Sequence, residues 1–393
     1  MDTRNAFARH TMAERIPAIL RDVLASNPDY PAPIQSAVEQ LRQSLLDGAP
    51  IPMLADEPAP PADYEAWAAA YRAQRARFEP LTWQRTEWFF AEMFLYRHLI
   101  QAVRWAETGR DPFAPQKQAE LNGERLWTAL DRILAFEGSD RERLANLLLS
   151  AVWGNQADLS HAVGQGAGAK TSDDDLLIDE RDAAVAILLD APPLPRRPVH
   201  LVLDNAGLEL AADLALADTL IAAGHRVVLH AKAYPVFVSD TTIPDIWRTL
   251  EALDRCEGRP RALAQRLRQA WAAERLRLTA PPLWTSSRFL WDMPPAFRRV
   301  MGRARAVIFK GDANYRRVVG DALWEEGVSF AEAVRYFPVP LVALRSLKSD
   351  ALVGLDSGRG RVLDAQGAGW RTSGRYGVIQ VAGGPTHDTP PGP

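Results

Sequence analysis

The pattern of apolar and polar positions divides the chain into a helical first part and a mixed second part. Before residue 152, apolar residues recur at the spacing of helices that bury one face. This spacing predicts helices at residues 16–24, 33–46, 62–78, 85–106, 118–134 and 141–152.

After residue 197, short apolar runs rich in β-branched residues predict buried strands. They lie at residues 198–203, 226–229, 305–309, 339–344 and 376–381. Helical patterns separate them, at 209–223, where we expect an amphipathic helix, and at 242–276 and 315–324. Strands that alternate with helices predict an α/β fold with a parallel sheet and right-handed crossovers.

Composition excludes several classes of protein. The 393 residues carry a formal net charge of −3, so the chain lacks the basic excess of a nucleic-acid-binding protein. Apolar runs are far shorter than the roughly 18 residues of a membrane span, so we expect no membrane partner. The single Cys256 excludes a disulfide framework and fits a reducing, cytoplasmic location.

Lysine is rare, with five residues among 46 basic ones. Coding bias is the simplest explanation, but the surviving lysines can also mark places that need a compact ammonium group. Lys117 and Lys170 fall in segments that we expect to be exposed. Three lysines lie at or just past the ends of predicted strands: Lys232, Lys310 and Lys348.

Acids and an amide follow the first two strands. Asp204 and Asn205 end the strand at 198–203, and the loop after the second strand reaches Asp240. Ligands of open α/β sheets bind at the carboxyl ends of strands, and oxygen donors suit Mg²⁺ or Mn²⁺. An Asp-Asn pair after a strand also fits a plain turn or a helix cap.

Basic residues at the same predicted edge suit a phosphate. Lys310 and Lys348 can neutralise phosphate oxygens as point charges, and Arg316 can bind them bidentately. Arg345 ends the strand at 339–344. Each group alone also fits a turn, a surface ion pair or a solvated strand end. Together with the acids they favour a metal-assisted phosphate site.

The helical part has one further candidate. Asn155 and Asp158 lie in a polar cluster that follows the predicted helix at 141–152. They can reach substrate hydroxyl groups, although a C-cap followed by an N-cap is the alternative. The seven histidines show no HxxxH or HxH spacing, which argues against zinc.

Five ordered motifs resemble a known family. They are AEMFLYR ending at Arg97, WGNQADLS from Trp153, DNAGLELAADL from Asp204, KGDANYR from Lys310 and RSLK from Arg345. Ser239-Asp240 fits as well. The set resembles the damage-control phosphatases, in the branch also called acidic residue methyltransferase. Ser346 stands where that branch has a threonine.

The resemblance implies a fold and an activity. It implies a Rossmann-like α/β/α sandwich after an N-terminal all-helical domain. We place the helical domain at 1–185, the α/β/α domain at 186–382 and a disordered tail at 383–393. It also implies a metal-dependent phosphatase of small phosphorylated metabolites, especially sugar phosphates such as fructose 1-phosphate, with Mn²⁺, Ni²⁺, Co²⁺ or Mg²⁺ as the cofactor.

The resemblance also assigns roles to residues. Asp204, Asn205 and Asp240 match the family's metal ligands, and Asp204, Asp240 and Lys348 are the residues expected to carry the reaction. We expect a water to attack the phosphate in line while Lys348 stabilises the charge that develops. Whether an aspartate, Asp204 or Asp240, acts as a nucleophile or as a base is left open. The expected substrate contacts are Asn155, Asp158, Glu209, Lys310, Asp312, Asn314, Tyr315, Arg316, Arg345 and Lys348.

Two other functions compete with the phosphatase. The branch's second name suggests a methyltransferase that uses S-adenosylmethionine to modify protein carboxyl groups. The loop after the first strand has a single glycine, Gly207, where a nucleotide-binding fold needs a glycine-rich turn. A non-catalytic phosphate-binding protein on the same scaffold is the third possibility.

Overall fold

The computed structural model describes residues 2, 4–55, 62–154, 175–190, 192–194 and 196–383. The chain forms two units, each assembled from three segments. Unit 1 comprises Met1–Asn122, Lys232–Thr242 and Ala280–Arg288, and unit 2 comprises Gly123–Ala231, Ile243–Thr279 and Phe289–Pro393. We describe each unit by itself.

Helices are the regular elements of unit 1 in the described ranges. They are α1 (Ala6–His10), a π-helical turn (Thr11–Arg15), α2 (Ile16–Ser26), α3 (Ala32–Leu46), α4 (Tyr64–Arg77), α5 (Trp88–Ala102), α6 (Trp105–Thr108) and α7 (Ala114–Leu121). A short 3-10 turn, Pro282–Thr285, completes the unit. Helix α5 is its core, because nearly every side chain from Trp88 to Ile100 is buried. The predicted helices at 16–24, 33–46 and 62–78 are confirmed. The helix predicted at 85–106 is α5, which ends at Ala102, and the separate helix α6 follows it.

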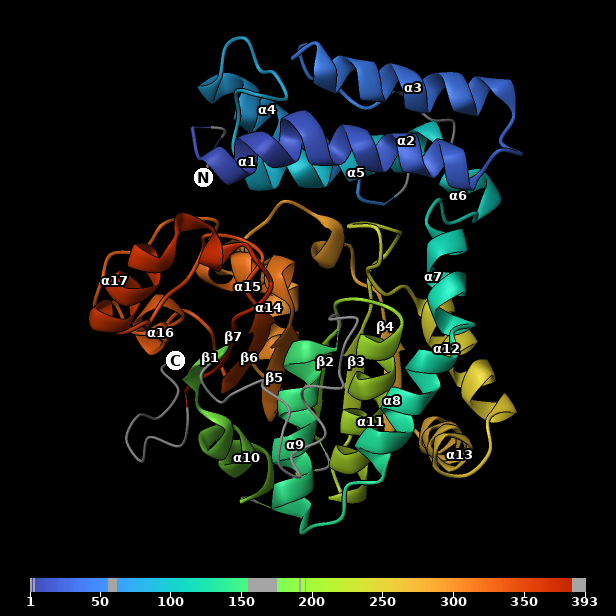
Figure 1. Cartoon of the computed structure of the whole chain (residues 1–393), viewed down its shortest axis with the longest axis vertical. Helices are drawn as coiled ribbons and strands as arrows, with labels where there is room; N and C mark the ends of the chain where they lie inside the picture. The colour runs from blue at the N-terminus through green and yellow to red at the C-terminus, as the bar shows by residue number, and fades with distance from the viewer. Residues whose placement is uncertain are drawn as a thin grey trace. The chain divides into compact units, whose positions relative to one another are not determined.

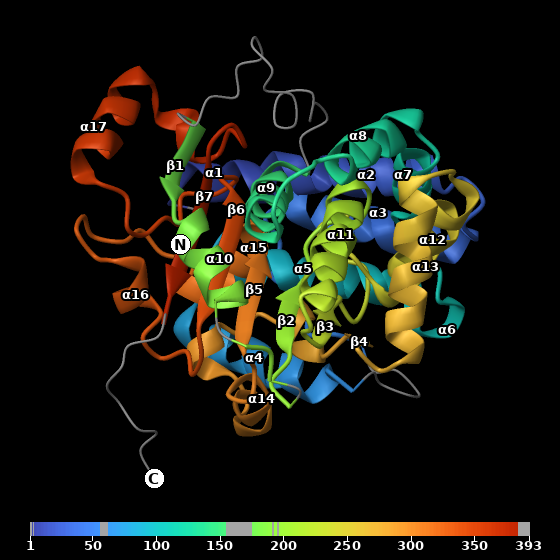
Figure 2. The ribbon, with the colours of Figure 1, turned by 90° about the horizontal axis from the view of Figure 1, so that it is seen from below.

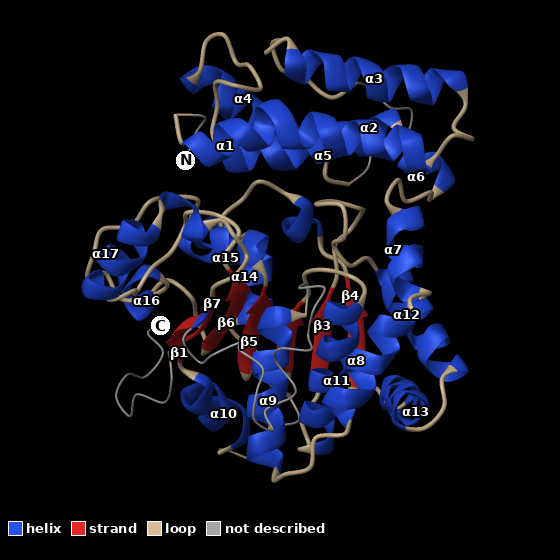
Figure 3. Ribbon diagram, viewed as in Figure 1, coloured by secondary structure: helices blue, strands red, loops and turns tan. Residues whose placement is uncertain are grey.

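Unit 2 is built around a sheet of seven strands. The strands are β1 (Leu176–Asp179), β2 (Val199–Val202), β3 (Val227–His230), β4 (Leu276–Thr279), β5 (Ala306–Lys310), β6 (Leu341–Ser346) and β7 (Gly377–Ala382). Their order across the sheet is β1-β7-β6-β5-β2-β3-β4. Figure 3 shows the strands gathered in this one sheet.

Helices cover both faces of the sheet. They are α8 (Glu124–Leu134), α9 (Asp140–Trp153), α10 (Arg181–Leu189), α11 (Leu208–Ala222), α12 (Ile243–Arg255), α13 (Arg259–Ala272), α14 (Pro295–Met301), α15 (Asp312–Val319), α16 (Phe330–Ala333) and α17 (Ser357–Gln366). Short 3-10 turns lie at Leu290–Asp292 and Ala368–Arg371. Helices α9 and α11 lie on one face and α14 on the other (Figures 1 and 2). The predicted Rossmann-like α/β/α sandwich is confirmed.

The order of the strands creates a switch point between β2 and β5. From β2 the chain moves outward through β3 to β4, and then returns to β5 on the other side of β2 before reaching β6. These five strands are mutually parallel. In such sheets the two diverging connections leave a crevice at the carboxyl ends of the central strands. The residues after β2 and β5 therefore occupy the position where ligands of this fold class bind.

The sheet differs from the prediction in three ways. Strand β7 pairs antiparallel with β6, so the sheet is mixed rather than parallel throughout. Strand β4 falls at the end of the segment predicted as helix 242–276, and strand β1 was not predicted. The three apolar residues of β1 lie between acidic ones, and the leucines of β4 alternate with the polar Arg277 and Thr279, so neither gives a continuous apolar run.

Three predicted helices also differ. The helix at 118–134 is two helices, α7 and α8, that break at Asn122-Gly123. The helix at 315–324 is α15, which begins earlier and ends before Gly320. Helix α11 is not amphipathic, because every side chain from Leu208 to Ala217 is buried. Neighbours in unit 2 cover it on several sides, including α8, α9 and α13.

The two units divide the chain at a different place from the domains predicted at 1–185 and 186–382. Helices α8 and α9 belong to unit 2, because α9 packs on α11, β6 and β7. Two loop segments of the second part, Lys232–Thr242 and Ala280–Arg288, belong to unit 1. Of the predicted tail at 383–393, residues 384–393 lie outside the described residues. No helix in the described ranges is long and apolar enough to span a membrane.

Candidate active site

The site in unit 2 begins at the carboxyl end of β2. Asp204 and Asn205 follow the strand after Leu203 and are both buried. Gly207 then adopts a φ of 76°, which allows a sharp turn into α11. The two polar side chains are thereby held between the end of β2 and the first turn of α11.

Gly311 brings the end of β5 against Asp204. This glycine follows β5 with a φ of 80°, and a Cβ there would lie only 1.8 Å from Asp204 Oδ2. The Asp204 carboxylate therefore rests directly on the backbone of the β5–α15 turn. Asn314 ties the same two strand ends together, because its Nδ2 donates to the carbonyls of Leu203 at 3.1 Å and Lys310 at 2.7 Å.

A chain of buried polar groups extends from Asp204 into α11. Asn205 Nδ2 donates to Asp204 Oδ2 at 2.8 Å and to Glu209 Oε2 at 2.9 Å. Lys310 Nζ donates to Glu209 Oε1 at 2.6 Å and lies 3.1 Å from Asp213 Oδ1. Three carboxylates, one amide and one ammonium thus form a continuous network at the switch point.

Burial and charge set the protonation of this network. Burial raises the pKa of Asp213 to about 7, against the opposing effect of the Lys310 ammonium. Burial alone would lower the pKa of Lys310, but Asp213 and Glu209 outweigh it and leave that pKa raised. Lys310 is fully buried and engaged by carboxylates. Its observed contacts are with these acids, so its predicted contact with a phosphate stays a prediction.

A second group of residues organises the loop after β6. Asp312 Oδ1 accepts hydrogen bonds from Arg345 Nε at 2.9 Å, from the backbone N–H of Lys348 at 3.0 Å and from Ser349 Oγ at 3.0 Å. Burial would raise the pKa of Asp312, but Arg345 and Arg316 outweigh it and lower that pKa. The ionised Asp312 therefore fixes the backbone that carries Lys348.

Lys348 is the basic residue of this group with a side chain partly open to solvent. Within the ranges that the structure describes, its ammonium makes no ion pair. Arg345, by contrast, is fully buried and donates to Asp312, to Ser349 and to the Ala351 carbonyl. The geometry gives Arg345 a role in holding the loop, and its predicted substrate contact stays a prediction.

Tyr315 and Arg316 are held inside unit 2. The Tyr315 hydroxyl donates to Gln380 Oε1 at 2.8 Å, and its ring lies 4.4 Å below the Arg345 guanidinium. Arg316 Nε donates to Asp321 Oδ1 at 2.8 Å, and both side chains are buried. These contacts stabilise α15 and the loop that follows it.

Asp240 belongs to unit 1. Its carboxylate lies 2.9 Å from Lys232 Nζ, and its backbone carbonyl accepts a hydrogen bond from Lys117 Nζ at 2.8 Å. Lys117 is buried, so the expectation that it lies in an exposed segment is wrong. Asn155, Asp158 and Lys170 lie outside the described residues.

Two residues of these networks escaped the sequence analysis. Asp213 lies four residues after Glu209 on the same face of α11, and two acids at that spacing in an otherwise apolar helix could have revealed it. Asp111 has its carboxylate 2.9 Å from Lys117 Nζ, but nothing in its local sequence distinguishes it from a surface acid.

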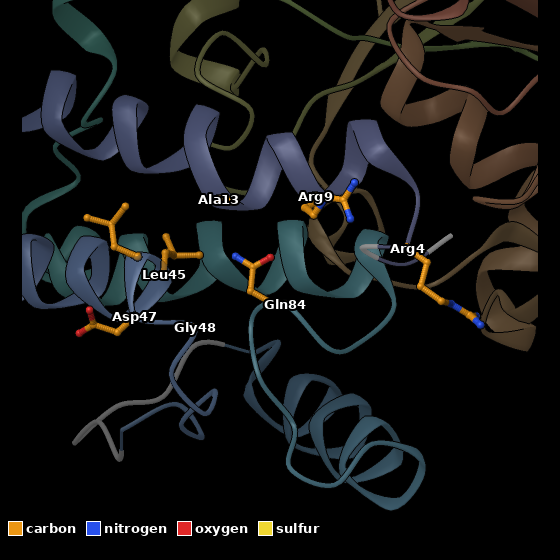
Figure 4. A pocket seen from close by; sticks show the side chains of 8 residues that line it. Arg4, Arg9, Ala13, Leu45, Asp47, Gly48 and Gln84 are labelled. Carbon is orange, nitrogen blue, oxygen red and sulfur yellow. The ribbon is translucent and has the colours of Figure 1, made fainter. Parts of the chain in front are cut away.

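A hollow lies outside these networks. It has a volume of about 590 Å³ and lies in unit 1 beside α1 and the end of α3 (Figure 4). Its lining consists of Arg4, Arg9, Ala13, Leu45, Leu46, Asp47, Gly48 and Gln84. None of the predicted site residues contributes to it. Among the described residues, no three histidines, cysteines, aspartates or glutamates are grouped as a ready metal site.

The fold and the network together define a class of protein. It is a doubly wound α/β protein with carboxylates, an amide and an ammonium group at the switch point of its sheet. Comparison with known sequences identifies the family. The model of the damage-control phosphatase ARMT1-like domain matches residues 11–363, so this chain belongs to that family. The membership supports a phosphatase with a role in metabolite repair.

Curated relatives cover most of the chain. Damage-control phosphatase ARMT1 of Danio rerio is 29% identical over an alignment of 427 positions, which covers 96% of this chain and 95% of that protein. The protein of the same name from Mus musculus is 30% identical, with 88% of this chain and 86% of that protein covered. A crystal structure of a DUF89 family protein from Pyrococcus horikoshii is 16% identical with a TM-score of 0.41, covering 75% of this chain and 89% of that one.

Proposed function

We propose that this protein is a metal-dependent phosphatase of small phosphorylated metabolites, with sugar phosphates such as fructose 1-phosphate as the substrate class. The observation that carries the proposal is the placement of Asp204 and Asn205 at the β2–β5 switch point, before the first turn of α11. The beginning of a helix favours anions, because its first N–H groups lack partners within the helix and its dipole is positive there.

The residues at the switch point fit a divalent cation. Asp204 offers carboxylate oxygens, and the Asn205 amide is oriented because its Nδ2 donates to Asp204 and Glu209. This orientation leaves Oδ1 as the Asn205 atom that suits a cation. Such hard oxygen donors suit Mn²⁺, Ni²⁺, Co²⁺ or Mg²⁺ in a site that keeps positions for water and phosphate. The bound metal would polarise the phosphoryl oxygens.

The surrounding residues would hold these ligands in place. Lys310 bonds to Glu209 and keeps that carboxylate against the Asn205 amide. Asn314 is fully buried, and within the described residues its Oδ1 has no hydrogen-bond partner, which suits a ligand or water at this point. Asp240, the predicted third ligand, lies in the other unit and stays a prediction.

The phosphate would be bound by Lys348. Its backbone is fixed by Asp312 and its ammonium is the partly exposed cation of that loop. In this role the ammonium neutralises charge that develops on the phosphoryl oxygens as water attacks. A point charge on a flexible stem suits this role, whereas the wider guanidinium fork requires a different geometry.

A turnover screen tests the proposal. The purified protein is stripped with a chelator, and each metal is added back with a panel of sugar phosphates while free phosphate is measured. We expect phosphate release with at least one metal, and a loss of roughly 10²-fold or more in kcat for Asp204→Asn and Lys348→Met. Lys348→Arg is expected to restore only part of the rate.

Asp218→Asn is the matched control. Asp218 lies on α11 like Glu209, but it pairs with the half-exposed Arg266 at 2.8 Å outside the network. This variant should retain full activity. No phosphate release with any metal, or full activity in Asp204→Asn, contradicts the proposal. Transfer of labelled methyl groups from S-adenosylmethionine in the absence of phosphatase activity would favour the methyltransferase instead.

A further inference from the structure

The turn that carries Asp240 in unit 1 is strained. Phe237 and Val238 have φ values of 50° and 71°, in the left-handed region. A left-handed conformation costs a non-glycine residue roughly 1–2 kcal/mol, and a β-branched valine is especially rare there. Such strain persists only where the surroundings hold the backbone in place, and it concentrates at functional sites.

Backbone and ring contacts hold part of this turn. The N–H of Asp240 donates to the Val236 carbonyl at 3.3 Å, and the N–H of Lys232 donates to the Thr241 carbonyl at 2.8 Å. The Phe237 ring lies 5.1 Å from the Tyr96 ring of α5. These contacts close the turn, but they do not reach the carbonyl or the carboxylate of Asp240.

Two buried lysines bind those remaining groups of Asp240. Lys232 Nζ lies 2.9 Å from Asp240 Oδ2, and Lys117 Nζ donates to the Asp240 carbonyl at 2.8 Å. Lys117 comes from α7, and its ammonium is anchored by Asp111 Oδ2 at 2.9 Å. All of these side chains are buried, and a buried ammonium is costly unless it is paired and hydrogen-bonded.

We propose that Lys117 is a positioning residue for Asp240. It clamps the strained turn through the Asp240 carbonyl, so that the Asp240 carboxylate is presented in one fixed orientation. The inference rests on the proposed function only in taking Asp240 as part of the catalytic machinery. A lysine suits the place, because its compact ammonium bonds a carbonyl and a carboxylate where five guanidinium N–H groups would need partners.

Hydrogen exchange measures the clamp directly, without metal or substrate. In Lys117→Met we expect the amides of residues 232–242 to exchange at least roughly tenfold faster, because the strained turn opens locally. Asp111→Asn keeps the side-chain volume and should give a smaller change in the same segment. Exchange in this segment that is unchanged in both variants overturns the proposal.

Gln74→Met is the control for general loss of stability in unit 1. Gln74 is buried and bonds Glu87 Oε2 at 2.6 Å and Thr86 Oγ1 at 2.9 Å, with no contact to Asp240 in the described residues. It should leave exchange at 232–242 unchanged. Acceleration there equal to that of Lys117→Met would show a merely structural role.

Mn²⁺ binding, measured by calorimetry with the metal alone, tests the consequence for function. Lys117→Met should weaken binding roughly tenfold in the wild-type background and have no further effect in Asp240→Asn. Equal weakening in both backgrounds, or none in either, overturns the proposal. If the wild type itself binds no Mn²⁺, the proposed function fails, while the exchange result still decides whether Lys117 clamps the turn.

Discussion

Gly311 shows at the residue scale how one absent carbon shapes the site. Its φ of 80° and the contact of Asp204 with its Cα both exclude a side chain. In Gly311→Ala the methyl group would displace the Asp204 carboxylate, and a displacement of about 1 Å at a reacting group costs roughly 10²-fold in rate. We expect such a loss in phosphate release from a sugar phosphate, together with a lower unfolding midpoint.

Gly327→Ala separates these two effects. Gly327 has a φ of 88°, but apart from its two chain neighbours no described residue has a heavy atom within 4 Å of the position of its Cβ. This variant should lose roughly 1–2 kcal/mol of stability from backbone strain and keep its activity. Equal activity in both variants would contradict the role assigned to the close contact at Asp204.

Individual site residues were predictable where chain order alone determined their place. Asp204 and Lys310 end strands that the apolar pattern identifies, so the switch point could be expected to bring them together. Lys117 could not be assigned, because its burial depends on Asp111 and on a turn 123 residues away. Periodicity along one segment contains no information about such distant partners.

At the scale of elements, β2 and β3 share a buried histidine pair. His200 Nδ1 lies 2.7 Å from His230 Nε2, and His230 packs against Phe297 of α14. Burial lowers the pKa of His200 to about 4, and burial with the neighbouring His200 lowers that of His230 well below its ordinary value. Both rings therefore stay neutral in the folded protein at mildly acidic pH.

This pair makes the sheet sensitive to acid. Below pH 6.5 the unfolded chain binds protons that the folded chain rejects, so stability is lost as the pH falls from 6.5 towards 4. His200→Gln should reduce the loss of stability between pH 7.5 and pH 5 by roughly 1–2 kcal/mol. Urea unfolding at the two pH values measures the difference.

His10→Gln serves as the control for loss of one imidazole, because His10 is exposed in unit 1. Its acid-dependent loss of stability should match that of the wild type. If His200→Gln loses as much stability between the two pH values as the wild type does, the pair is not the source of the acid sensitivity.

Elements were predictable where apolar runs were long and separated by clear breaks. Strands β2, β3, β5, β6 and β7 met this condition, and each was expected within a few residues of its bounds. The reversed direction of β7 was not predictable, because β7 is buried on both faces like the parallel strand β6 beside it, and both give the same kind of apolar run. Likewise, α11 looks amphipathic at Glu209 and Asp213, although Lys310 from β5 buries both acids.

At the scale of the whole molecule, unit 1 depends on segments far apart in the sequence. Trp67 donates to the Tyr234 hydroxyl at 3.2 Å, and Tyr234 donates to the Thr285 carbonyl at 3.1 Å, so all three segments meet within the unit. We expect that, after cleavage at a protease site inserted between Asn122 and Gly123, the two fragments remain associated. Size-exclusion chromatography should show both fragments in one peak.

Two observations check this expectation. The fragments should separate in concentrated urea, where the buried contacts of unit 1 are lost. Phe237→Ala removes the ring contact with Tyr96, so in this variant a larger fraction of the fragment 1–122 should elute separately. Elution of residues 1–122 alone from the native protein would contradict the assignment of the later segments to unit 1.

The division of unit 1 into three segments has a consequence for synthesis on the ribosome. Its last segment ends at Arg288, so the helices completed by Asn122 must wait while 166 more residues (288 − 122) are added. At about 5–20 residues per second this wait lasts roughly 10–30 seconds. Until Tyr234 and Phe237 are added, α5 lacks the contacts that they make with Arg97 and Tyr96, so we expect the nascent N-terminal half to bind chaperones during this part of the wait.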